Sequence, residues 1–289
     1  MADPSITLVT HRALPLGAPD DRLLADAITS RRIAVRFAVW NDPGIDWTVT
    51  PMALVRSAWD YHHAPQSWAA WIETTHRLTT LVNAPSLLHW SSDKRYLVEL
   101  QRRGVPCVPT VVIESGENEL LRAITKKQGW DEIVVKPVFG ASSQGVSRFG
   151  PDAIDLYGQA HLTALLKRGA AVVQPYLRGV ETARERSLVF IAGEFTHAFT
   201  KRAFSGIAVD AADIRLYDAS DTERQVGLEA IAALSEQPVY ARVDLVPTDT
   251  GPKLMELELV EPDLGLRLSA CALQSLVTAC QTIVDRVRS

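Results

Sequence analysis

Two neighbouring stretches near the end of the chain alternate strictly between apolar and polar residues. Residues 255–262 read MELELVEP, and residues 241–246 read ARVDLV. A period of two predicts β-strands, because successive side chains of a strand point to opposite faces of the sheet. Residues 248–252, TDTGP, have the composition of a hairpin turn. We therefore expect an antiparallel hairpin whose polar face carries Glu256 and Glu258, about 7 Å apart.

The register of this hairpin decides which side chains meet. Closure that is symmetrical about Thr250 places Asp244 opposite Glu256, and the same register places Arg242 opposite Glu258. A β-bulge would shift the register by one residue. Three carboxylates on one sheet face stabilise a fold poorly, but they supply the oxygen ligands that hard cations prefer. The hairpin therefore predicts a site for divalent metal ions at Asp244, Glu256 and Glu258.

The rest of the chain alternates between strand-like and helix-like periodicity, which predicts an α/β (α+β) protein. The expected strands are residues 6–10, 33–40, 52–55, 110–113, 133–137, 146–149, 171–176, 187–191 and 194–201. The expected helices are residues 21–29, 93–103, 119–128, 153–167, 222–235 and 270–287. The longest expected loop, residues 202–214, has the length of a lid over a binding site.

Composition narrows the class of protein. The chain has 289 residues, of which 47% are hydrophobic and 22% charged, as in a globular protein of enzyme size. The net charge of -4 offers no basic surface for nucleic acid. No apolar run reaches the ~20 residues that cross a bilayer, and the first residues lack the pattern of a secretory signal. We therefore expect a cytoplasmic protein with no membrane partner. The three cysteines are too scattered for a disulfide framework or a metal-ligand spacing.

A second set of residues joins a lysine to a glycine-rich loop. Lys136 ends the apolar strand at 133–137, where a buried ammonium requires an anionic partner. The following loop, residues 139–146 (FGASSQGV), offers backbone N–H groups and hydroxyls to phosphate oxygens. It lacks the pattern of a Walker P-loop. The alternative is an ordinary hairpin turn, and Lys136 favours the phosphate site.

Two further segments lie at the ends of expected strands. QPYL at 174–177 bends at a proline, which leaves backbone groups able to hydrogen-bond an adenine edge; a plain strand end is the alternative. RSAWDYHH at 56–63 lies where ligands of open α/β sheets collect. The alternative there is a turn, capped by Asp60, that leads into a helix. Lys201 closes the strand at 194–201 and is either a functional group or a solvent-exposed lysine. The adjacent pair His62 and His63 lacks the usual ligand spacing of zinc sites.

In their chain order, these residues resemble the ATP-grasp ligases. The ordered set comprises Lys94, Lys136 with the glycine-rich loop, the QPYL segment, Lys201, Arg242 with Asp244, and the MELELVEP strand. The resemblance covers residues 93–269 and the small α/β domain before them, and it is strongest to the glutathione synthetase-like branch. Within that branch, residues 56–62 (RSAWDYH) and 261–269 (EPDLGLRLS) are similar to the O-ureido-serine cyclo-ligases, or cycloserine synthetases, which close the cycloserine ring.

The resemblance implies an ATP-grasp fold of three subdomains, in which two α+β lobes hold the nucleotide between them. Residues 1–90 would form an N-terminal α/β substrate domain. Residues 91–177 would form the central lobe with the glycine-rich lid, and residues 178–289 the C-terminal lobe with the metal-binding hairpin. The oligomeric state stays open.

The resemblance also implies a role for each matching residue. The ATP phosphates would be bound by Lys94, Lys136, Gly140, Ser142, Ser143 and Gly145. The adenine would be framed by Gln174, Tyr176 and Leu177, and the ribose would be held by Glu181 or Glu185. Two Mg²⁺ ions would be held by Asp244, Glu256 and Glu258. The catalytic residues would be Lys201 and Arg242, and Arg242 would stabilise the transferred phosphoryl group.

Two positions depart from the family pattern. The family commonly has asparagine where this chain has Glu258, so the metal site here carries one more negative charge. Arg186 stands where an apolar or aromatic residue is expected, which leaves the choice of the ribose-binding glutamate open.

The implied chemistry is the ligation of a carboxylate with an amine through an acyl phosphate, with release of ADP. Arginines suit a carboxylate, and acidic side chains suit an amino group, so we expect an amino-acid-like substrate. The candidate substrate-binding residues are Arg12, Arg56, Asp60, Tyr61, His62, Arg202, Glu261 and Arg267. Three functions stay open: a ligase for a small amino-acid derivative that closes a ring, in cycloserine antibiotic biosynthesis; an intermolecular peptide or glutathione synthetase-like ligase; and a nucleotide-binding regulatory module without turnover.

Overall fold

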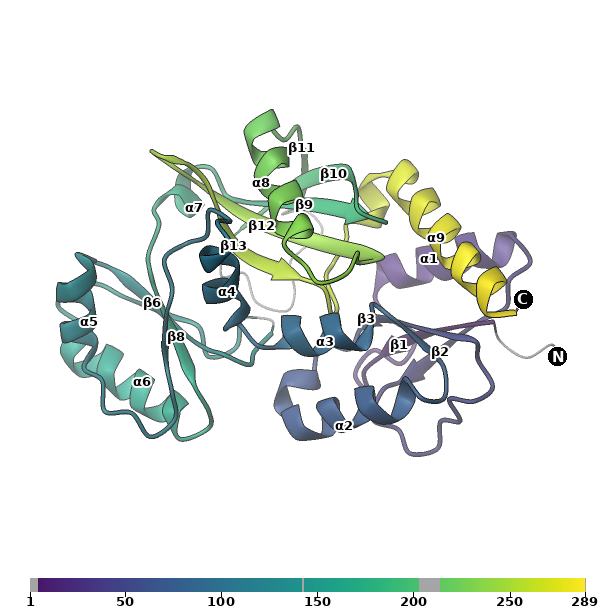
Figure 1. Cartoon of the computed structure of the whole chain (residues 1–289), viewed down its shortest axis with the longest axis horizontal. Helices are drawn as coiled ribbons and strands as arrows, with labels where there is room; N and C mark the ends of the chain where they lie inside the picture. Colours follow the sequence, from purple (N-terminus) through teal and green to yellow (C-terminus); the bar gives the residue numbers. More distant parts are fainter. Residues whose placement is uncertain (1–4, 142, 203–213, 289) are drawn as a thin grey trace.

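The computed structural model describes residues 5–141, 143–202 and 214–288, and its strands form three sheets (Figure 1). The N-terminal sheet is parallel, has the order β2-β1-β3-β4, and consists of β1 (Ile6–Thr10), β2 (Val35–Val39), β3 (Met52–Ser57) and β4 (Thr80–Val82). The central sheet is antiparallel, has the order β5-β8-β6-β7, and consists of β5 (Val111–Ile113), β6 (Ile133–Pro137), β7 (Ser147–Phe149) and β8 (Ala171–Pro175).

The third sheet is also antiparallel and has the order β11-β10-β9-β12-β13. It consists of β9 (Glu185–Ile191), β10 (Glu194–Lys201), β11 (Arg215–Tyr217), β12 (Tyr240–Thr248) and β13 (Gly251–Glu258). The expected strands at 6–10, 133–137 and 194–201 match the observed bounds. The sequence pattern did not predict β4 or β11, which are three residues long and too short for a visible period.

The helices of the N-terminal part are α1 (Pro19–Ser30), α2 (Pro65–Thr75) and α3 (Pro85–Ser92). All three begin with a proline, which suits the first turn because that turn has no intrahelical use for its N–H groups. An aromatic core lies under α2, where Trp68 stacks on Trp71 and meets Trp40 edge-on. Helix α3 was not predicted, and the helix expected at 93–103 is the shorter α4 (Tyr96–Arg102).

Helices cover the other two sheets from outside. The central sheet packs against α5 (Leu121–Gln128) and against a helical stretch made of a π-helical turn (Ile154–Gly158) and α6 (Gln159–Leu166) (Figure 1). One face of the third sheet packs against α4 and α8 (Asp221–Ala232). A short helix, α7 (Gly179–Thr182), follows β8 and was not predicted.

The opposite face of the third sheet is divided into an apolar half and a polar half. The apolar half includes Val189 and Tyr240 and packs against α1 and the C-terminal helix α9 (Ala270–Arg288). The polar half carries charged side chains and remains open. Arg288 of α9 donates a hydrogen bond to Ser5 (2.6 Å), so the two ends of the described chain lie together (Figure 1).

Buried polar side chains join the N-terminal sheet to the third sheet. The Asn83 amide donates to the carbonyls of Leu259 (2.7 Å) and Tyr240 (2.9 Å). The Tyr240 hydroxyl donates to the Val55 carbonyl (2.6 Å). One hydrophobic core contains residues of both the N-terminal sheet and the third sheet, so it marks no boundary between domains. The three domain ranges stay a prediction. Across the described residues, no helix is long and apolar enough to span a membrane.

Candidate active site

A cavity of about 480 Å³ lies where the three sheets meet. Its lining comes from the N-terminal domain, from the glycine-rich loop, from the end of β8 and from the polar half of the third sheet. The predicted site residues in this lining are Arg56, Tyr61, Lys94, Lys136, Gly140, Ser143, Gln174, Tyr176, Leu177, Glu185, Lys201, Arg202, Arg242, Glu256, Glu258, Glu261 and Arg267. Residues far apart in sequence therefore converge on one cavity.

The predicted pairing of the acidic hairpin is confirmed. Asp244 pairs with Glu256, and Arg242 pairs with Glu258. The turn is tighter than a symmetrical closure, because Thr248 pairs with Gly251, and a bulge at Met255 restores the register. The bulge also moves Met255 away from the core that holds Leu257, which differs from the expected alternation. Met255 instead packs beside Tyr176 and lines the cavity.

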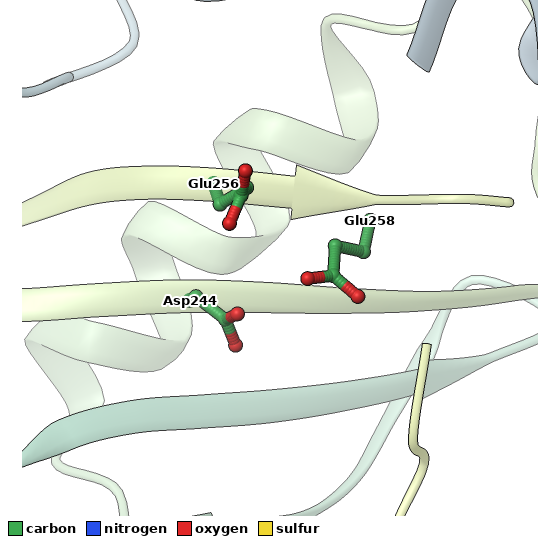
Figure 2. A group of neighbouring side chains, drawn as sticks. All are labelled: Asp244, Glu256 and Glu258. Carbon is green, nitrogen blue, oxygen red and sulfur yellow. The ribbon is translucent and has the colours of Figure 1, made fainter. Parts of the chain in front are cut away.

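The three hairpin carboxylates come together on the sheet face. Figure 2 shows Glu256 and Glu258 on β13 and Asp244 on the neighbouring β12. Each offers a carboxylate oxygen, and these oxygens lie within 4.8 Å of one another. Oxygen ligands at this spacing fit a hard divalent cation such as Mg²⁺.

Asp244 lies at the base of this group and is fully buried. Arg242 donates to both of its oxygens (2.9 and 2.8 Å), and the Ser187 hydroxyl donates to Oδ1 (2.6 Å). Burial would raise its pKa, but Arg242 and Lys201 overcome this and hold the pKa far below its usual value. Arg242 also donates to Glu258 (2.6 Å), so the extra negative charge of this glutamate has a partner.

Lys201 is also part of this network and is not solvent-exposed. Its ammonium lies 2.7 Å from Glu185 and 2.9 Å from Asp244. Burial raises the pKa of Glu185 to about 8, with Lys201 opposing the shift and Asp244 adding to it. The alternative of an exposed Lys201 is therefore wrong.

Two lysines approach the carboxylates from the central lobe. Lys94 lies 2.9 Å from Glu256 and donates to the Gly140 carbonyl (2.6 Å). Lys136, 8% exposed, has no ion pair among the residues that the structure describes. Burial lowers the pKa of Lys136. Burial would raise the pKa of Glu256, but Lys94 and Lys136 lower it to about 2, so this carboxylate is ionised at neutral pH.

The glycine-rich loop covers the cavity from one side. A Cβ on Gly140 would lie 2.8 Å from Pro137 Cγ, so a larger residue would push the loop outward. Gly145 has a φ of +73°, which favours glycine, but it lies outside the cavity lining. Gln144 lines the cavity, and its amide oxygen accepts a hydrogen bond from His62 Nε2 (3.2 Å). The predicted phosphate contact Ser142 lies outside the described residues.

The QPYL segment borders an apolar part of the cavity. Tyr176 and Leu177 pack beside Val108, Val180 and Met255, and this flat apolar surface fits the face of a nucleobase. Val108, Val180 and Met255 were not predicted as site residues, because isolated apolar residues carry no sequence signal beyond core packing.

The two candidate ribose ligands occupy different environments. Glu181 is exposed, lies outside the lining, and accepts from the Tyr176 hydroxyl (2.8 Å). Glu185 lines the cavity among the charged groups. Arg186, the unexpected arginine, points to the opposite sheet face, where it pairs with Glu223 and stacks on Tyr217. It takes no part in the cavity.

The substrate candidates divide into two groups. Arg56, Tyr61, Arg202, Glu261 and Arg267 line the cavity. Arg12, Asp60 and His62 lie outside this lining. The Asp60 side chain accepts from Trp40 Nε1 (2.6 Å) and makes no capping hydrogen bond, so the alternative in which Asp60 caps the turn is wrong. Most of the expected lid loop, residues 203–213, lies outside the described residues.

Three acidic residues in the lining were not predicted. Asp20 and Asp21 lie in the first turn of α1, and Asp263 follows the hairpin. In the sequence, two acids after a proline indicate only a helix start. Their place in the cavity depends on packing between segments more than two hundred residues apart.

Comparisons with known proteins agree with this arrangement. Residues 6–83 match the family described as D-cycloserine synthetase DcsG, N-terminal domain. The cycloserine biosynthesis protein DcsG of Streptomyces lavendulae is 32% identical over 262 residues, which cover 85% of this chain and 87% of that protein.

Solved structures extend the likeness over the whole chain. The crystal structure of D-cycloserine synthetase DcsG has a TM-score of 0.89 at 28% identity and covers 98% of this chain and 99% of that one. The ATP-grasp ligase PsnB, complexed with a phosphomimetic variant of its minimal precursor, Mg and ADP, has a TM-score of 0.63 at 15% identity, with 98% and 99% covered. This second likeness shows the fold alone.

The expected ATP-grasp fold is therefore confirmed, as is the resemblance to the cycloserine-forming ligases. The chain belongs to the DcsG family of ATP-grasp ligases.

Proposed function

We propose that this ligase acts in D-cycloserine biosynthesis and closes a ring within one O-ureido-serine-type amino acid, using ATP and releasing ADP. The observation that carries the proposal is the group of three carboxylates within 4.8 Å on β12 and β13, beside lysines of the central lobe and facing a cavity shared with the N-terminal domain. A nucleotide and a small substrate would thus meet in one cavity.

In this proposal, Asp244, Glu256 and Glu258 hold two Mg²⁺ ions. The bound metal would neutralise charge on the phosphate oxygens during transfer. Four cationic side chains, Lys94, Lys136, Lys201 and Arg242, face four carboxylates on the sheet, the three hairpin acids and Glu185. The cationic side chains suit phosphate oxygens and the hairpin carboxylates suit divalent metal ions, so the site suits a triphosphate that arrives together with divalent cations.

The base and ribose would bind at the apolar end. Gln174, Tyr176 and Leu177 would frame the adenine against the apolar surface of Val108 and Met255. The ribose hydroxyls would be held by Glu181 or Glu185: Glu181 accepts from the Tyr176 hydroxyl beside the adenine surface, and Glu185 lines the cavity. The backbone of the glycine-rich loop would cover the phosphates and exclude water, which otherwise hydrolyses an acyl phosphate.

The reaction would follow two steps. A substrate carboxylate oxygen attacks the γ-phosphorus of ATP, the bond to the β-phosphate oxygen breaks, and ADP leaves. A nitrogen of the same substrate then attacks the carbonyl carbon, and phosphate leaves with the former carboxylate oxygen. Arg242, held between Asp244 and Glu258, would stabilise the transferred phosphoryl group, since its guanidinium is fixed before the reaction.

The test is ADP release from ATP with purified protein and a panel of amino acids and O-substituted serines, with and without hydroxylamine. We expect turnover with an O-substituted serine alone, a hydroxamate when hydroxylamine is present, and a cyclic product when it is absent. A strict requirement for a second amine would instead show an intermolecular ligase. No turnover of ATP with any member of the panel would show the regulatory module and overturn the proposal.

A further inference from the structure

The glycine-rich loop contacts the N-terminal domain as well as its own lobe. In the central lobe, Lys94 donates to the Gly140 carbonyl (2.6 Å), and His161 donates to the Gly145 carbonyl (2.9 Å). On the other side, the loop meets a short 3₁₀ turn, Tyr61–His63, which follows β3 in the N-terminal domain. The function proposed above makes no use of this contact between the loop and the turn.

Aromatic packing forms one part of this contact. The Phe139 ring meets the Tyr61 ring edge-on, with 5.4 Å between the ring centroids and an interplanar angle of 73°. Tyr61 is buried and packs in turn on Trp68 of the aromatic core under α2. Ala141 packs against the same core. The side chains on both sides of Gly140 therefore pack against the N-terminal domain, where edge-on aromatic pairs are favourable.

A hydrogen bond between two side chains forms the other part. His62 Nε2 donates to the Gln144 amide oxygen (3.2 Å), although the two residues lie 82 positions apart in the sequence. Gln144 lines the cavity, whereas His62 lies outside the lining. Burial lowers the pKa of His62, so its ring is uncharged at neutral pH and is no cation for a phosphate. His62 therefore reaches the cavity only through the loop.

The two contacts lie at opposite ends of the loop, since Phe139 begins it and Gln144 lies near its end. Without them, the loop would be held by its own lobe alone, and water would enter the cavity more often. A water oxygen that bonds to the carbonyl carbon of an acyl phosphate displaces phosphate, gives up its proton to solvent and restores the original carboxylate. Such a step consumes ATP without forming product.

We propose that His62 is a positioning residue which, together with Tyr61, fastens the glycine-rich loop to the N-terminal domain and so shields the acyl phosphate from water. It acts through Gln144 and contacts neither the nucleotide nor the substrate. The shielding role rests on the proposed function, because it requires an acyl phosphate in the cavity. The attachment of the loop does not depend on the reaction and is tested separately.

The attachment is tested by limited proteolysis, which needs no turnover. Chymotrypsin cleavage after Phe139 is followed by mass spectrometry, with cleavage after the exposed Tyr157 of the same lobe as the internal reference. We expect His62→Ala to raise the relative rate after Phe139 by about 5-fold, as the loss of one hydrogen bond implies. His62→Gln keeps an N–H donor for Gln144 and should restore the wild-type rate. The control His76→Ala changes an exposed histidine outside the cavity lining and should have no effect. An unchanged rate in a folded His62→Ala would overturn the inference.

The shielding role is tested by the ratio of ADP released to cyclic product formed from O-ureido-serine. This ratio should be about one in the wild type and in His62→Gln, and about 3- to 10-fold higher in His62→Ala. Gln144→Ala should raise it equally, and the double variant should be no worse than either single one, because both side chains act through one contact.

Three outcomes would decide against these roles. A wild-type ratio in folded His62→Ala would overturn the shielding role. Independent, additive effects of His62→Ala and Gln144→Ala would show that His62 acts by another route, and would overturn it too. A wild type that forms no cyclic product would instead overturn the proposed function, while the proteolysis would still decide whether His62 holds the loop.

Discussion

Charged side chains are paired differently at the two ends of the cavity. On the hairpin, the two most buried charged groups, Asp244 and Arg242, have several partners: Asp244 receives hydrogen bonds from Arg242, Lys201 and Ser187. At the N-terminal end, the described residues give Arg56 one ion-pair partner, Asp21, and no acceptor for its Nη1. Around Asp244 the charged groups form a shared network, whereas Arg56 and Asp21 form a single pair.

The two arrangements of charge have different consequences for ligand binding and for stability. A network of both cations and carboxylates can exchange its internal partners for ligands of both signs, such as a divalent cation with a triphosphate. At the N-terminal end, Arg56 and Asp21 are buried together, so loss of either one leaves the other as a buried charge without its ion-pair partner. The comparison also predicts that removing one charge affects activity at the hairpin and stability at the N-terminal end.

The largest expected effect is on turnover. Glu256→Gln should lower kcat by on the order of 10³-fold or more, because a metal ligand that supplies several kcal/mol of transition-state stabilisation is lost. The fold should be retained, since the Glu256 side chain is 26% exposed. Steady-state ADP release and circular dichroism would measure both. The matched control is Glu194→Gln, an exposed residue of the same sheet, which should keep full activity. An inactive Glu256→Gln that is also unfolded would count against this role.

The second prediction compares the loss in free energy of unfolding when one charge is removed at each end of the cavity. Asp21→Asn should lower the free energy of unfolding by about 3–5 kcal/mol, because it leaves Arg56 as a buried charge without a counter-ion. Glu258→Gln should cost less than about 1 kcal/mol, because Arg242 keeps Asp244 as a partner. Urea denaturation of both variants would measure the difference. Similar losses in the two variants would remove the distinction between network and isolated pair.

The third effect concerns the nucleotide. Lys136→Ala should raise the KM for ATP by about 10- to 100-fold, as expected for the loss of one charge-assisted contact to a phosphate. Titration of ATP at saturating substrate would measure this. The control is Lys126→Ala on α5, an exposed lysine outside the cavity lining. An unchanged KM for ATP in Lys136→Ala would exclude this lysine from the phosphate site.

The smallest effect is a pH dependence of stability that arises outside the cavity lining, on the third sheet. His197 lies on β10 beneath Leu264 and Gly265, and burial lowers its pKa below 6.5. The unfolded chain therefore binds the proton more readily, so the contribution of this histidine to stability is lost as the pH falls below 6.5. Denaturation curves between pH 5 and about 7.5 should show a shallower dependence in His197→Asn than in the wild type. Identical slopes would contradict a buried neutral His197.

Local sequence patterns predicted the hairpin face but little of the substrate end. The alternation of residues 241–246 and 255–262 was sufficient to place Asp244 opposite Glu256, because strand periodicity is a local property. The bulge at Met255 was not predicted, since it follows from the tight turn at 248–251. The ATP-grasp fold came from the order of motifs, none of which identifies it alone.

The substrate end depends on long-range packing, which a single sequence does not display. Arg56 meets the Pro262 carbonyl 206 residues later in the chain. Asp20 and Asp21 had the composition of an ordinary helix start, and nothing near them indicated a cavity. Conversely, Arg12 had the chemistry of a carboxylate ligand but lies outside the lining, because the turn after β1 directs it to the surface.

The most direct test is a crystal structure of the protein with a non-hydrolysable ATP analogue and Mn²⁺, with the ions located by anomalous scattering. We predict manganese bound to oxygens of Glu256 and Glu258 and in contact with the analogue's phosphates. Manganese on the phosphates alone, with both glutamates still paired only to Lys94 and Arg242, would contradict it.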